Sequence, residues 1–220
     1  MPTASFNRME VSFLDKMIAS PVAVIILLIT VLTSIVAFER PDVQRRMLMR
    51  PYSVLQHREW YRVFSCTLVH GGILHLAFNG LAYYFFALES GMEIVLGHIE
   101  FFILYIGSTV FSAIPALVRH GDNPLYESLG ASGAVSGVVL AFILMAPDAT
   151  LGLLFIPGVT FPAWLMGLFY ILFSFVASLR GFGRIDHAAH LFGALGGVLF
   201  LVLLKPVTAE LFLKWLNHQF

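Results

Sequence analysis

The chain has little charge and almost no cysteine. Only 12% of its 220 residues are charged, whereas a soluble domain carries roughly 25%. The formal net charge is zero and no long basic run occurs, which argues against nucleic acid as a partner. A single cysteine, Cys66, excludes an internal disulfide, and its apolar neighbours indicate a packed, unreactive thiol.

Apolar residues are abundant instead. They make up 59% of the chain, and the mean hydropathy is +0.86, which places the chain among membrane proteins. The first apolar stretch, Pro21–Phe38, follows Lys16 and has 18 residues, more than the roughly 7–15 of a signal-peptide core. We therefore expect a retained anchor.

Six apolar segments approach the roughly 20 residues that a membrane-spanning helix needs. They are 21–38, 66–88, 101–118, 131–146, 161–179 and 188–204. The sequence therefore predicts an all-α membrane protein, a bundle of six transmembrane helices at 21–205. An N-terminal tail at 1–20 and a C-terminal tail at 206–220 flank the bundle.

Two connections stand out. Glu39–Ser65 is polar and holds six arginines, yet it also contains apolar and aromatic residues, which predicts a folded insertion at the membrane interface. Leu151–Ile156 is apolar, but it is bounded by Pro147 and Pro157 and is too short to span a membrane.

The fourth segment is short, with 16 residues. A deficit of about four residues, at roughly 1.5 Å rise each, leaves one helix end about 6 Å below the membrane surface. Ser132 lies at that end, after the turn-rich stretch 121–124, which we expect to line a water-filled recess. The alternative is that Leu125–Gly130 extends the helix.

Ser132 is a candidate nucleophile. In the first turn of a helix, backbone N–H groups lack partners and the dipole favours negative charge, so an oxyanion formed there meets donors. Gly130 and Gly133 permit a tight entry and a close approach of substrate. The alternative is that the serine is an N-cap.

Two glycine pairs predict helix contact. Gly133 and Gly137 form a face of small residues, and so do Gly193 and Gly197; such faces let membrane helices touch backbone to backbone. His190 lies one turn before Gly193 and shares its face. Docking the faces brings the imidazole to the serine as a general base. The alternative is plain packing, with His190 bonded to a backbone carbonyl.

His75 and Asn79 are four residues apart and share a helix face. An imidazole and an amide that point into one cavity suit a developing oxyanion. They serve equally well as hydrogen-bonding links between helices.

Asp186 precedes His190 by four residues, but it suits the N-cap of the sixth helix, which leaves a Ser–His dyad. A metal site built from Asp186, His187, His190 and His75 is the alternative. Because no HExxH pattern occurs, we expect no metal and no cofactor.

Together, these motifs resemble those of the rhomboid family of intramembrane serine proteases, over roughly Trp60 to Leu204. They follow the family's order on the second, fourth and sixth spans, as His70, His75 and Asn79, then Gly130, Ser132 and Gly133, then His190, Gly193 and Gly197. The resemblance implies a six-helix rhomboid-like bundle. It also implies Ser132 as nucleophile, His190 as base, and an oxyanion hole made by His75, Asn79 and the Ser132 amide.

Supporting residues follow from the same resemblance. Trp60 and Arg62 resemble the family's Trp-Arg pair in the long first loop. Glu93 resembles the acidic residue that ties the second span to its neighbours, although Glu89 is an alternative. Many family members have an aromatic residue four positions after the nucleophile, and its ring supports the catalytic imidazole. This sequence has Ser136 there instead.

The family layout puts the N-terminal tail in the cytoplasm. Lys and Arg then number nine outside and four inside, which opposes the positive-inside rule. We keep the family orientation because a folded first loop need not behave as a simple translocated tail. The resemblance thus implies an endopeptidase of a bacterial inner (plasma) membrane.

Its substrates would be transmembrane proteins within the lipid bilayer, and the fifth span and the loop Arg180–Ile185 would form a mobile cover. The alternatives are a non-catalytic rhomboid-like protein that binds transmembrane helices, and a small transporter or metal carrier.

Overall fold

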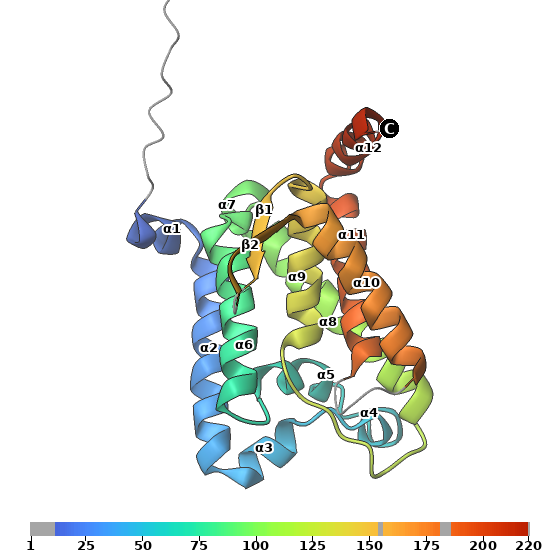
Figure 1. Ribbon diagram of the computed structural model, residues 1–220. Helices are drawn as coiled ribbons and strands as arrows, with labels where there is room; N and C mark the ends of the chain where they lie inside the picture. Colours follow the sequence, from blue (N-terminus) through green and yellow to red (C-terminus); the bar gives the residue numbers. More distant parts are fainter. Residues whose placement is uncertain (1–11, 154–155, 181–185, 220) are drawn as a thin grey trace, which may run out of the picture.

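The computed structural model describes residues 12–153, 156–180 and 186–219, and these residues are mostly helical (Figure 1). The bundle consists of α2 (Pro21–Glu39), α6 (Ile73–Tyr83) with the π-helical η2 (Tyr84–Glu89), α8 (His98–His120), α9 (Ser132–Met145), α10 (Ala163–Arg180) and α11 (His187–Leu204). The shorter helices are α1 (Phe13–Ala19), α3 (Pro41–Met47), α4 (Pro51–His57), α5 (Arg62–Ser65), η1 (Cys66–Leu68), α7 (Met92–Leu96) and α12 (Val207–Gln219).

Four helices, α2, α8, α10 and α11, are long and apolar enough to cross a membrane. A fifth candidate joins α5–η1 to α6–η2 across a bend. The fourth predicted segment is the shorter apolar helix α9, with 14 residues. The protein is therefore a multi-pass membrane protein, and the arrangement is compatible with the predicted six-helix bundle.

The second predicted segment, 66–88, is not one straight helix. The chain bends by 98° between Arg62–Leu68 and Ile73–Glu89, so the long helix of this segment begins at Ile73, after the bend. Gly71 and Gly72 lie at the bend, where two consecutive glycines weaken helix formation.

The fifth predicted segment begins two residues too early, because Phe161 and Pro162 belong to a strand. Strands β1 (Thr150–Leu153) and β2 (Ile156–Pro162) pair antiparallel, with Thr150 opposite Pro162 and an irregularity after Gly152. A residue that precedes proline favours extended backbone, which holds Phe161 in β2. The bundle therefore carries one small sheet that the all-α prediction did not include.

Both predicted tails contain a helix. Residues 12–20 of the predicted N-terminal tail include α1, and most of the predicted C-terminal tail forms α12. Both helices lie at the end of the bundle opposite to α3, α4 and α5 (Figure 1).

The first loop is folded around Arg62. Helices α3 and α4 each begin with proline, which suits the first helical position. The buried Arg62 guanidinium donates to the carbonyls of Arg46 (2.7 Å) and Leu48 (2.9 Å) and pairs with Glu59. Trp60 is 52% exposed, so of the predicted pair it is the arginine that holds the loop together.

Glu93, in α7, ties the second span to the first. Its side chain is fully buried, and it accepts hydrogen bonds from the N–H groups of Val22 (3.1 Å) and Ala23 (2.7 Å) in the first turn of α2. A carboxylate at a helix N-terminus satisfies free donors and complements the helix dipole. His98 Nδ1 lies 2.5 Å from the same carboxylate.

Replacing Glu93 with alanine is expected to destabilise the fold by about 3 kcal/mol, because it leaves buried donors without partners. This corresponds to a fall of about 10 °C in melting temperature, measured in detergent. The control is Glu89→Ala, whose side chain is 43% exposed and pairs with Lys16. An equal fall in both variants would contradict the role assigned to Glu93.

Candidate active site

Helices α9 and α11 touch backbone to backbone. A side-chain carbon added at Gly193 would overlap the carbonyl of Gly133, and one added at Gly197 would overlap backbone atoms of Gly137. The two glycine faces therefore dock on each other, in the arrangement that the spacing indicated.

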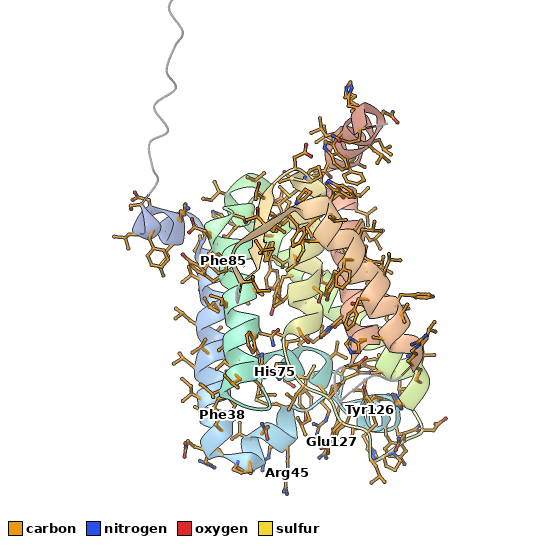
Figure 2. All side chains as sticks on the ribbon, viewed as in Figure 1. Phe38, Arg45, His75, Phe85, Tyr126 and Glu127 are labelled. Atoms are coloured by element: carbon orange, nitrogen blue, oxygen red, sulfur yellow. The ribbon has the colours of Figure 1, made fainter. Side chains whose placement is uncertain are left out.

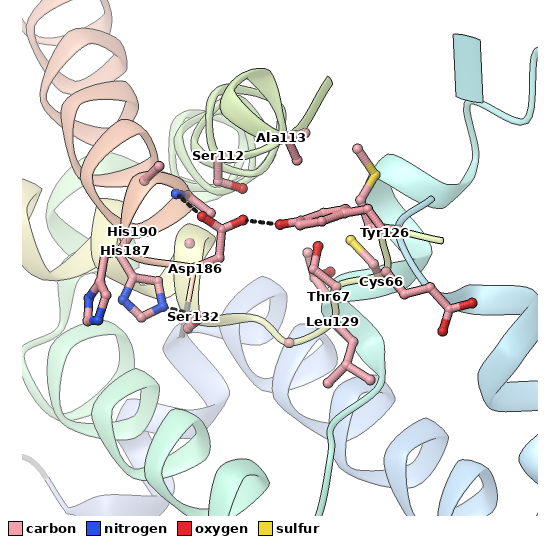
Figure 3. Close-up of a pocket in the computed structure, with 18 of the residues that line it drawn as sticks. Cys66, Thr67, Ser112, Ala113, Tyr126, Leu129, Ser132, Asp186, His187 and His190 are labelled. Carbon is pink, nitrogen blue, oxygen red and sulfur yellow. Dashed lines mark hydrogen bonds between the residues drawn. The ribbon is translucent and has the colours of Figure 1, made fainter. Parts of the chain in front are cut away.

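This docking brings Ser132 and His190 together. His190 Nε2 lies 2.6 Å from Ser132 Oγ, a hydrogen-bonding distance (Figure 3). The N-cap of α9 is Ala131, and Ser132 is the first helical residue, with its hydroxyl directed to His190. The N-cap alternative for this serine is therefore not what the structure contains.

The residues before Ser132 are not helical, so the alternative in which Leu125–Gly130 extends α9 is wrong. Tyr126 and Glu127 lie towards the end of the bundle that carries α3 and α4 (Figure 2). Gly130 has φ of 114°, in the region that favours glycine. A side-chain carbon there would also lie 2.7 Å from His75 Cε1.

A cavity of about 880 Å³ opens at the dyad. Its lining includes Ser132, His190, His75 and Asn79, together with Arg119 and Glu127. The predicted nucleophile, base and oxyanion donors thus share one space, large enough for a segment of peptide.

His75 and Asn79 line this space, and each carries a side-chain nitrogen that can donate a hydrogen bond. The N–H of Gly71 approaches His75 Nδ1 at 3.5 Å, which favours the tautomer with the proton on Nε2. Asn79 Nδ2 donates to the carbonyl of His75 (3.0 Å), which leaves its second amide hydrogen free of that bond.

His70 braces the approach to the nucleophile. Ser34 Oγ donates to the carbonyl of Leu68 and lies 2.9 Å from His70 Nδ1, so that nitrogen is the donor to the hydroxyl. His70 Nε2 then accepts the N–H of Ala131 (3.3 Å). The fully buried imidazole links α2 to the residue before Ser132.

Asp186 caps α11. Its carboxylate accepts the N–H of Ala189 (2.9 Å) and the hydroxyl of Tyr126 (2.8 Å) (Figure 3). Burial and then the neighbouring Asp186 carboxylate raise the pKa of Tyr126 above its usual range, so the phenol stays protonated and remains a donor. Asp186 thus fixes the start of α11 rather than the His190 ring.

Ser136 brings no aromatic ring to the imidazole, as the sequence indicated. Ser136 Oγ donates to the carbonyl of Ser132 (2.6 Å) and is hydrogen-bonded to Tyr170 of α10. The ring of His187 lies edge-on to His190, with centroids 6.1 Å apart, and also contacts Phe173.

Three contributors were absent from the predicted site: Tyr126, Tyr170 and, except as a metal candidate, His187. No motif marks them. Only the aromatic character of Tyr126, in a polar loop just before the nucleophile, was a usable signal.

The predicted cover lies only partly within the described chain. Helix α10 supplies Ala177 and Ser178 to the cavity lining, whereas residues 181–185 of the predicted cover lie outside the described residues. Among the residues described, no group of three or more His, Cys, Asp or Glu could hold a metal ion.

Comparison with known proteins gives one family. Residues 57–207 match the family model described as Rhomboid domain. The chain is 32% identical over 136 residues to the mitochondrial presenilin-associated rhomboid-like protein of Bos taurus. This alignment covers 61% of this chain and 36% of that protein. It is 33% identical over 146 residues to YdcA of Bacillus subtilis, provisionally named a rhomboid protease; this alignment covers 64% of this chain and 65% of that protein. It is 34% identical over 143 residues to mitochondrial Rhomboid protein 1 of Saccharomyces cerevisiae; this alignment covers 63% of this chain and 40% of that protein.

The matched part spans little more than a third of the two mitochondrial relatives and just under two thirds of the bacterial one. Because mitochondrial and bacterial proteins both occur among these relatives, the prediction of a bacterial inner membrane is not supported.

Proposed function

This chain belongs to the rhomboid family, and from that premise we propose that it is a serine endopeptidase that cleaves peptide bonds in or next to transmembrane segments. The observation that carries the proposal is the 2.6 Å approach of His190 Nε2 to Ser132 Oγ. This is the nucleophile–base contact that activates a hydroxyl.

In the first half of the reaction, His190 Nε2 takes the proton of Ser132 Oγ as the oxygen attacks a substrate carbonyl. The negative oxygen of the tetrahedral intermediate is then stabilised by His75 Nε2–H, the Asn79 amide and the Ser132 N–H. As the C–N bond breaks, His190 gives its proton to the leaving amine. An ester between Ser132 and the new carboxyl end remains.

In the second half, water attacks that ester. His190 takes a proton from the water, the oxyanion donors act again, and the proton returns to Ser132 Oγ as the acid product leaves. The polar residues of the 880 Å³ cavity offer water a place beside the dyad.

The substrate must present an unwound segment, because a transmembrane helix satisfies its backbone hydrogen bonds internally. Small residues, glycine or proline near the membrane surface weaken a helix, and we expect cleavage there. Helix α10 borders the cavity and would be the element that moves to admit such a segment.

A fluorophosphonate probe tests this proposal on the purified full chain. We expect covalent labelling of the unchanged protein and none of Ser132→Ala. Ser112→Ala is a matched control, because Ser112 also lines the cavity but donates to the carbonyl of Thr109; it should label normally. If the unchanged protein is not labelled, the alternative of a non-catalytic protein that binds transmembrane helices is favoured.

A further inference from the structure

A second, much smaller cavity shares one lining residue, Asn79, with the active-site cavity. Its volume is about 10 Å³, and it lies between α2 and α6, with α8 and the start of α9 completing the lining. Of the described residues, Asn79 alone lines both cavities. Whatever occupies the small cavity therefore contacts a residue of the proposed oxyanion hole.

Two hydroxyls line this small cavity without a hydrogen-bond partner among the described residues. They are Thr30 Oγ1, on α2, and the phenol of Tyr83, on α6. Thr30 is 6% exposed and Tyr83 is 3% exposed. Buried polar groups in folded proteins are nearly always paired, with protein or with ordered water.

The cavity suits one water molecule. A site needs about 10–15 Å³ and two to four polar partners to hold a water. Thr30 and Tyr83 bring two unpaired hydroxyls to the lining, and Asn79, whose side chain ends in an amide, is a third polar residue of it. No carboxylate is among the lining residues, so the chemistry favours a neutral ligand over a cation.

A water bound in the small cavity would affect the orientation of the Asn79 amide. Tyr83 follows it by one helical turn, on the same face of α6. One Asn79 amide hydrogen is bonded to the carbonyl of His75. A donor that held the amide oxygen would fix which way the group points, since the two ends of an amide are nearly equal in shape.

We propose that the small cavity binds one water molecule that holds the Asn79 amide in the orientation needed for the oxyanion hole. The water accepts from Thr30 and Tyr83 and donates to Asn79 Oδ1. The second amide hydrogen is then directed to the active-site cavity, where a reversed amide would present an oxygen to the developing negative charge. Thr30 and Tyr83 are thus positioning residues, and this role rests on the proposed function.

Kinetics of Tyr83→Phe and Thr30→Val test the role, because both changes keep the shape and remove a hydroxyl. Loss of one oxyanion donor lowers kcat by about 10²–10³-fold; a donor left unfixed should cost about tenfold in kcat, with KM unchanged. The matched control is Tyr84→Phe, whose phenol is on the surface and bonds Glu89. It should cleave at the normal rate.

Asn79→Ala supplies the decisive background. Since Thr30 and Tyr83 act through Asn79, removing their hydroxyls should cause no further loss of kcat once Asn79 is alanine. A loss of equal size in both backgrounds would mean general damage to the fold and would overturn the proposal, as would normal kcat in both single variants.

A crystal structure of the full chain at a resolution that orders water tests the site itself, whether or not the protein cleaves a substrate. We expect one ordered water within hydrogen-bonding distance of Thr30, Tyr83 and Asn79, and none there in Tyr83→Phe/Thr30→Val. Absence of that water from the unchanged protein overturns the site. If the water is present but the unchanged protein neither cleaves nor labels, the proposed function fails and the site stands.

Discussion

Replacement of His190 by alanine is expected to lower the rate of substrate cleavage by about 10⁴- to 10⁶-fold, the range seen when the base of a serine hydrolase is removed. Without the imidazole, the Ser132 hydroxyl keeps its proton and is a weak nucleophile. Single-turnover cleavage of a transmembrane substrate in proteoliposomes measures the effect.

The same assay separates a dyad from two independent residues. Ser132→Ala/His190→Ala should be no slower than either single variant, because residues that act as one unit do not contribute additively. His218→Ala, on the exposed face of α12, should cleave normally. Cleavage at the normal rate by His190→Ala would remove the imidazole from the mechanism.

The contact between α9 and α11 could be predicted from the sequence because both helices repeat the same spacing of glycines. Two glycines four residues apart mark a face on one helix, and a second pair marks a face on another. Such faces have few other uses in a membrane, so the docking of Gly133 on Gly193 followed from spacing alone. The meeting of serine and histidine followed from that docking.

The part that sequence could not predict depends on single polar residues that are far apart in the chain. Tyr126 bonds Asp186 from 60 residues away, and His70 bonds Ala131 from 61 residues away. Neither pair belongs to a periodic pattern, so only the folded backbone brings the partners together. Hydropathy is likewise blind to the 98° bend inside the second predicted segment.

The glycine docking also predicts a large structural effect. In Gly197→Ala, the new carbon would overlap three backbone atoms of Gly137, and backbone atoms cannot rotate aside as a side chain can. Helices α9 and α11 must then separate. We expect the free energy of unfolding to fall by about 3 kcal/mol, the upper end of the usual cost of overpacking. This would be measured as a fall of about 10 °C in melting temperature.

Activity should fall with stability in this variant, because Ser132 and His190 lie on the same two helices. A displacement of about 1 Å between reacting groups can cost about 10²-fold in rate, so we expect cleavage at least tenfold slower at temperatures where the variant is still folded. Gly80→Ala is the matched control for the melting temperature, since its new carbon would lie 3.9 Å from Leu27 Cδ1, an ordinary contact. Alanine favours a helix by about 1 kcal/mol over glycine, so Gly80→Ala should melt no lower than the unchanged protein. If Gly197→Ala behaved in the same way, the helices would not be held at backbone contact, and the glycine faces could not be what brings the serine to the histidine.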